Sequence, residues 1–173
     1  MISKRYQNEK SAYHANIKEL PWPEREYLEY NKSIFTYISD SHGCTGVCSF
    51  CSDAQSGKYY TTREPEDIFS EIKTVHSRTG SRNFFFTGGS FEDPGKKGKK
   101  KIHELCKLIE QSSLKLSFGC YIKADSFKEN KEDLGLLALM RVVGFYNIFA
   151  GIESGNDYDL KLFKKRATLK DNQ

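Results

Sequence analysis

Apolar residues along the chain recur in two alternating patterns: short continuous runs, and longer segments with apolar positions three or four residues apart. The runs predict buried β-strands, and the spaced segments predict amphipathic helices. The strand-like runs lie at residues 34–39, 83–87, 114–121 and 145–150. The helix-like segments lie at residues 62–80, 102–109, 134–144 and 157–165. The pattern therefore predicts a strand followed by a helix, four times in succession.

Local signals support the helix limits. Pro65 and the acids Glu66 and Asp67 suit the first turn of the first helix, whose N-terminal end carries partial positive charge. Gly80 and Gly144 stand where the first and third helices should end.

Alternating strands and helices predict an α/β fold with parallel strands and right-handed crossovers. The residues alone fit either a doubly wound sheet or a barrel-like sheet. In both, the chemistry lies on loops after the carboxyl ends of the strands. Three such loops have unusual compositions, and they lie at residues 40–51, 87–90 and 151–155.

Composition fits one globular domain. Of 173 residues, 38% are hydrophobic and 29% are charged, which is too apolar for a disordered chain. No apolar window is long enough for a membrane span and the N-terminus has no apolar signal core, so we expect a cytoplasmic protein. The net charge of +4 does not support nucleic-acid binding. We expect the basic run at residues 96–101 to be a solvated loop before a helix, with a phosphate-binding patch as the alternative.

Residues 1–32 are polar and show no sustained period, so we expect a linker or an arm, with residues 33–173 as the core domain. Within this stretch, Leu20-Pro21-Trp22-Pro23 is rigid and extended. Trp22 is its expected anchor.

The loop after the first strand holds Cys44, Cys48 and Cys51, spaced C-x3-C-x2-C. Thiolates are soft, anionic ligands that suit iron–sulfur clusters, and this spacing lets one loop hold three corners of a cubane. The fourth iron would then be left for a substrate or a cofactor.

A tetrahedral zinc site is the main alternative, and it would need a fourth ligand such as His42, His103 or Cys120. The remaining cysteine, Cys106, lies in an apolar pattern, as Cys120 does, and both are expected to be small buried hydrophobes.

The other two unusual loops are less specific. Gly88-Gly89 either forms a plain turn or lets the backbone approach a ligand closely. Glu153 and Ser154 either cap the next helix or recognise ribose hydroxyls or an ammonium group.

The cysteine spacing, with Phe50 before the third cysteine, resembles the signature of the radical S-adenosylmethionine (radical SAM) enzymes. More narrowly, residues 20–25 resemble the interdomain linker of the branch that carries a cobalamin-binding domain, and residues 151–155 resemble its fourth-strand motif. The resemblance covers about residues 18–170. It implies a partial (β/α) barrel, of which this chain would supply about four parallel strand–helix units.

The resemblance also implies the chemistry. The three cysteines would hold a 4Fe–4S cluster, whose unique iron binds S-adenosylmethionine. One electron, from a reductant such as flavodoxin or ferredoxin, would cleave the cofactor to methionine and a 5′-deoxyadenosyl radical. That radical would abstract hydrogen from a substrate, either a small molecule or one of unknown kind.

The cofactor contacts implied by the resemblance come from all the unusual loops. The wider family often has an acid where this chain has Ser90. The expected contacts are Phe50 near the adenine, Gly88, Gly89 and Ser90 at the methionyl amino group, Lys123 at its carboxylate, and Glu153 and Ser154 at the ribose or methionyl part.

The family's barrel has six strand–helix units, and this chain has room for about four, since each takes roughly 30 residues. We therefore expect a fragment, a truncated product or one part of a split enzyme, with cobalamin possible only through a domain absent from this chain. An iron–sulfur electron-transfer or scaffold protein without its own catalysis is the alternative. An apolar strand edge at 145–150 predicts self-association.

Overall fold

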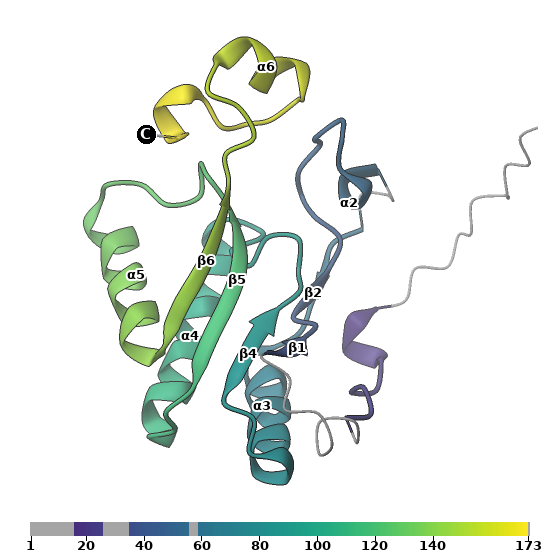
Figure 1. Cartoon of the computed structure of the whole chain (residues 1–173), viewed down its shortest axis with the longest axis vertical. Coiled ribbons are helices and arrows are strands. Elements are labelled where there is room, and N and C mark those ends of the chain that lie inside the picture. The colour runs from purple at the N-terminus through teal and green to yellow at the C-terminus, as the bar shows by residue number, and fades with distance from the viewer. Residues whose placement is uncertain (1–15, 26–34, 56–58, 173) are drawn as a thin grey trace, which may run out of the picture.

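The computed structural model describes residues 16–25, 35–55 and 59–172, and a parallel sheet lies at its centre (Figure 1). The sheet has four strands in the order β1-β4-β5-β6. Their bounds are β1 Thr36–Ile38, β4 Asn83–Phe86, β5 Ser117–Lys123 and β6 Phe145–Gly151. All three neighbouring pairs are parallel, so the predicted strand direction is confirmed.

Three long helices connect these strands and lie together on one side of the sheet (Figure 1). They are α3 Pro65–Thr79, α4 Lys96–Ser112 and α5 Lys131–Val143, and a shorter helix, α6 Asp157–Leu162, follows β6. Each new strand is added on the same side of the one before it, without the reversal of order that defines a doubly wound sheet. The fold is thus the predicted partial barrel of strand–helix units.

The predicted helix ends are confirmed. Pro65 is the first residue of α3, and Gly80 ends that helix in the left-handed conformation, with φ 72°. Gly144 ends α5 with φ 111°, and a Cβ there would lie 2.1 Å from the carbonyl oxygen of Leu116. Glycine is therefore required at residue 144 both by its φ angle and by the close approach of the backbone.

The expectation of a loop at residues 96–101 was wrong, because these lysines form the first turns of α4. Lysine is a good helix former, and its long stem can pack while its ammonium finds a partner. Lys99 pairs with Asp133 at 2.6 Å, and its ammonium lies over the ring of Phe127. Lys101 is half-buried and contacts the hydroxyl of Thr62.

The core lies between the sheet and the helices. Phe84 and Phe86 have no exposed surface, and the ring of Phe86 stacks on those of Phe118 and Phe145. Cys106 and Cys120 are also fully buried, as predicted. Burial raises the pKa of the Cys106 thiol to about 12, as expected for an inert structural cysteine.

The opposite face of the sheet is aromatic. Because side chains alternate along a strand, Phe85 points away from its two neighbours. Its ring contacts Tyr37, Tyr121 and Phe149, which are each about half exposed. Within the described residues, the inner face of this half-barrel is therefore an open aromatic surface.

The described part of the predicted arm, residues 16–25, is held against α3. Arg25 pairs with Glu71, which also pairs with Arg63, and all three side chains are buried. The Trp22 indole N–H donates to Asp67 at 3.0 Å, yet Trp22 is 38% exposed. Arg25 is thus held more deeply than the expected anchor. The rest of the predicted arm lies outside the described residues.

Among the described residues, no helix has both the length and the apolar character needed to cross a bilayer.

Candidate functional site: a three-cysteine pocket at the strand ends

A short antiparallel ribbon closes the base of the cysteine loop. It pairs β2 (Ser41–His42) with β3 (Thr61–Thr62), and α2 (Ser52–Gln55) lies between them, directly after the third cysteine. Gly43 has φ 82°, and a Cβ there would lie 2.2 Å from the carbonyl oxygen of Tyr59. The ribbon is too short for the hydrophobic pattern to predict. The ribbon holds together the two ends of the segment that carries the cysteines, shortly after the end of β1.

The three cysteines of this loop line one pocket of about 190 Å³, and each is half-buried. Gly46 lies between the first two, and its amide donates to the Cys44 sulfur at 3.2 Å. A Cβ on Gly46 would lie 3.3 Å from the sulfur of Cys44 and 4.0 Å from that of Cys48. Glycine at this position therefore leaves room between the sulfurs.

The donor set fits an iron–sulfur cluster. Among the described residues, no three His, Cys, Asp or Glu side chains gather tightly enough to hold a single metal ion. A cubane instead takes each thiolate on a different iron, so it needs three thiols on a shared wall rather than at one point. An amide aimed at a sulfur is a further feature that suits a thiolate ligand.

Electrostatics at the first cysteine favour the neutral thiol until metal binds. Burial raises the pKa of Cys44, and the nearby Asp93 adds to this, while the Gly46 amide and Lys123 act in the opposite direction. Because metals bind the thiolate, loading this site must release a proton.

The pocket brings together four of the seven residues that were predicted to contact the cofactor, and these are Phe50, Gly89, Lys123 and Glu153. They come from the cysteine loop, the loop after β4, the end of β5 and the segment after β6. Each of the three unusual loops thus contributes at least one residue to this pocket, as their expected position on one face of the sheet predicted.

The other three predicted contacts face elsewhere. The Gly88 amide donates to Asp40 at 2.9 Å, and the fully buried Ser90 donates to Glu92 at 2.6 Å. Ser154 donates to Asp159 at 2.9 Å and so organises the start of α6. The cofactor roles of all seven residues stay predictions.

Lys123 forms an ion pair with Asp93, which the sequence pattern did not single out. The Asp93 carboxylate also accepts from the Thr45 amide at 3.0 Å and from its hydroxyl at 2.8 Å. Burial alone would raise the pKa of Asp93, but the hydrogen bonds from Lys123 and Thr45 outweigh it, and the pKa lies below its usual value. The sequence gives one signal for Asp93, which is that this acid directly precedes Pro94 and lies three residues after Ser90.

Glu153 is held in an uncommon backbone conformation. Its φ is 66°, a left-handed value that is uncommon for residues other than glycine, and strained residues of this kind cluster at functional sites. Its carboxylate pairs with Lys165 at 2.9 Å, and the Lys165 side chain is only 7% exposed. A Cβ on Gly151 would lie 2.9 Å from the Lys165 nitrogen. Gly151 therefore lets the lysine reach Glu153.

Phe50 forms part of a contact between the cysteine loop and the C-terminal segment. Its ring packs edge-on against Phe163, with centroids 5.4 Å apart. The neighbouring Ser49 amide donates to the Phe163 carbonyl at 2.9 Å. Phe50 remains 50% exposed, so its ring still has a free surface beside the cysteines.

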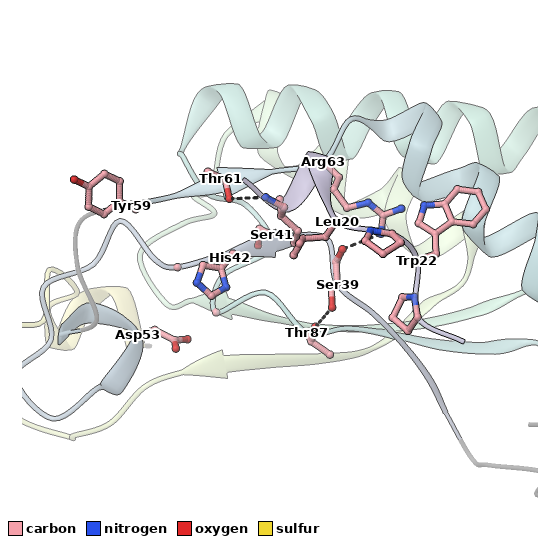
Figure 2. Close-up of a pocket in the computed structure, with 15 residues that line it drawn as sticks. Leu20, Trp22, Ser39, Ser41, His42, Asp53, Tyr59, Thr61, Arg63 and Thr87 are labelled. Carbon is pink, nitrogen blue, oxygen red and sulfur yellow. Dashed lines mark hydrogen bonds between the residues drawn. The ribbon is translucent and has the colours of Figure 1, made fainter. Parts of the chain in front are cut away.

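A second, larger pocket of about 770 Å³ lies between the arm and the strand ends (Figure 2). Leu20 and Trp22 line it on the arm side, and His42 and Asp53 line it near the cysteine loop. Gly89 lines both this pocket and the cysteine pocket.

The proposed zinc ligands do not join the cysteine pocket. His42 lines the larger pocket, Cys120 is buried in the core, and His103 is exposed on α4.

Comparison with known proteins decides the family. The model of the radical SAM superfamily matches residues 38–172, which is most of the chain. The chain belongs to the radical SAM superfamily. Members of this superfamily use a 4Fe–4S cluster and S-adenosylmethionine, and both fit the donor set of the cysteine pocket.

Two solved radical SAM enzymes share the fold of this chain. The apo form of the cobalamin-dependent radical SAM enzyme OxsB superposes with a TM-score of 0.79 at 22% identity, covering 93% of this chain and 24% of that one. The radical SAM methyltransferase TsrM from Kitasatospora setae superposes with a TM-score of 0.64 at 20% identity, covering 79% and 26%. At these identities, the likeness shows the fold alone.

Among curated relatives, the anaerobic magnesium-protoporphyrin IX monomethyl ester cyclase of Cereibacter sphaeroides is 28% identical over 135 residues. The match covers 77% of this chain and 21% of the cyclase. The chain thus spans about a fifth of the length of this relative.

Proposed function

We propose that residues 33–173 form the cluster-binding and cofactor-binding part of a radical SAM catalytic site. One observation carries the proposal: Cys44, Cys48 and Cys51 share a pocket with Gly89 and Glu153, which other strand ends deliver. A plain electron carrier needs the three thiols and a fourth ligand. The additional strand-end groups around them suit a cofactor bound beside the cluster.

Each group has a separate task in this proposal. The three cysteines hold the cluster, and the Gly89 backbone leaves space for the methionyl end of S-adenosylmethionine. Glu153, which is held by its ion pair with Lys165, lines the pocket and would accept hydrogen bonds from hydroxyl groups of the cofactor. When bound, the cluster and S-adenosylmethionine supply a one-electron cleavage that yields methionine and a 5′-deoxyadenosyl radical.

Four further residues would either contact the cofactor or hold the loops around it in place. Lys123 can reach a cofactor carboxylate only by sharing its ammonium with Asp93. Gly88 and Ser90 shape the loop from inside through their own hydrogen bonds, and Ser154 does the same for the start of α6.

The partners follow from the chemistry. The cluster requires one electron per cleavage, which suits a flavodoxin or ferredoxin as reductant. The open aromatic face beside the pocket suits a substrate that must be kept from water while a radical forms. Relatives named as a cyclase and as a methyltransferase carry out different reactions, so the substrate stays unassigned.

Anaerobic reconstitution with iron and sulfide tests the cluster. We expect broad absorbance near ~400 nm from thiolate-bound iron. Cys48→Ala should lose this absorbance, whereas Cys106→Ala, which changes a buried core cysteine, should keep it if the protein folds. Zinc binding without such absorbance would contradict the assignment.

Adding S-adenosylmethionine to the reduced, reconstituted protein tests the cofactor. A change in the EPR signal of the cluster would support binding at the cluster. An intact cluster whose signal does not respond would instead favour an electron-transfer or scaffold protein.

A further inference from the structure

The loop after β4 presents only one of its three key residues to the pockets. A Cβ on Gly88 would lie 2.1 Å from the Ser41 hydroxyl oxygen, so that position faces inward. Ser90 is fully buried and donates to Glu92. Gly89 lines both pockets and has no side chain. These three residues therefore bring no charged side chain to the point where the pockets meet.

A carboxylate from another element occupies that point. A Cβ on Gly89 would lie 2.8 Å from Oδ2 of Asp53 and 3.6 Å from the Cβ of Cys44. Asp53 belongs to α2, which follows the third cysteine, and Figure 2 shows its side chain at the cysteine-loop end of the larger pocket. The carboxylate thus lies in the space that a side chain at residue 89 would fill, next to the first cysteine.

The carboxylate of Asp53 can form hydrogen bonds with only one of the two positive groups of S-adenosylmethionine. S-adenosylmethionine carries two positive groups, a sulfonium and an α-ammonium, and only the ammonium has N–H donors. A carboxylate oxygen accepts such donors in short, charge-assisted hydrogen bonds. A cation resting on the Gly89 backbone, beside the cysteine that would hold the cluster, lies within reach of Asp53.

We propose that Asp53 binds the α-ammonium group of S-adenosylmethionine and supplies the negative charge that the Gly88-Gly89-Ser90 loop lacks. This inference rests on the proposed function. Asp53 is exposed, so solvent screens its charge and the gain in affinity is moderate. A charge-assisted hydrogen bond of this kind corresponds to about a tenfold change in affinity.

The test compares two ligands on the reconstituted full chain. Asp53→Asn removes the charge and keeps the shape, and Glu66→Gln removes one charge from an exposed site on α3 as the control. Anaerobic equilibrium dialysis measures the affinity for S-adenosylmethionine and for its analogue without the amino group. Iron and sulfide content is measured in the same samples.

We expect Asp53→Asn to bind S-adenosylmethionine about tenfold more weakly and to bind the deamino analogue like the wild type. Cluster content should not change, and Asp53→Glu should recover part of the affinity. The proposal is overturned if Asp53→Asn binds S-adenosylmethionine normally, or if it weakens both ligands equally. A wild-type protein that holds its cluster but binds neither ligand would instead overturn the proposed function, and the role of Asp53 with it.

Discussion

Lys123 and Asp93 form an ion pair that joins the end of β5 to the loop after β4. Asp93 also accepts two hydrogen bonds from Thr45, the residue after the first cysteine. Only 1% of the Asp93 side chain is exposed, so its charge depends on these partners. The pair therefore fixes the cysteine loop to two other strand ends.

Asp93→Asn should loosen the cysteine loop without removing a ligand. The amide cannot hold Lys123 as an ion pair, so the cluster of the reconstituted protein should decay about tenfold faster when a chelator is added, as the loss of one charged hydrogen bond predicts. The decay is followed as absorbance near ~400 nm. Asp125→Asn, two residues after Lys123, is the matched control. Equal decay rates in the two variants would contradict the bracing role.

The pH dependence of stability should reveal Asp133 near the start of α5. Burial alone would raise its pKa, but Lys99, the Lys128 amide and Asn130 outweigh it and hold the pKa below its usual value. Because the folded pKa is lower than the unfolded one, the stabilisation is present above pH about 4 and is lost as the pH falls below that.

Asp133→Asn should therefore lower stability by about 1–2 kcal/mol at pH 7 and by less at pH 3. Thermal unfolding of both proteins at the two pH values measures this. Glu132→Gln, an exposed neighbour in the same turn, should have little effect at either pH. A loss in Asp133→Asn that does not depend on pH would rule out the charge as its cause.

The inner aromatic face depends on Gly119 in β5. A Cβ there would lie 2.5 Å from the Phe85 ring, which is largely buried. Gly119→Ala should destabilise the protein by about 1–3 kcal/mol through overpacking. At Gly135 in α5, an added Cβ would meet nothing within 4 Å among the described residues beyond the backbone of its own helix, so Gly135→Ala should instead stabilise the protein by about 0.5–1 kcal/mol. Urea unfolding measures both, and combining Gly119→Ala with Phe85→Leu should recover part of the loss.

The sequence predicts those parts of the fold that local signals determine. Apolar periodicity locates the strands and long helices, and Pro65, Gly80 and Gly144 locate helix ends, because each acts through its own backbone geometry. The lysines of α4 were wrongly predicted to form a solvated loop, because the prediction used their charge. Their aliphatic stems and their helix propensity instead favour a packed helix.

The candidate site is less predictable, because its contacts join residues that are far apart in the sequence. The cysteines are recognisable from spacing alone. The pairing of Lys123 with Asp93, 30 residues apart, and the position of Asp53 beside Gly89 depend on how the strands are ordered. The two-residue ribbon of β2 and β3 is too short to show a period.

The edge of the sheet at β6 should make the isolated chain self-associate. Within the described residues, β6 has a strand neighbour only at β5, and Tyr146 and Phe149 on it are more than half exposed. Unpaired backbone groups beside apolar side chains favour pairing with another chain.

Phe149→Lys should therefore raise the monomer fraction, because a lysine on an edge strand opposes pairing. Tyr158→Lys, which replaces an aromatic residue that is 77% exposed on α6, is the matched control and should leave association unchanged. Sedimentation velocity over a range of concentrations measures both. A wild-type chain that stays monomeric at high concentration would contradict the role of the edge. Equal gains from both lysines would show that added charge, rather than the strand position, opposes association.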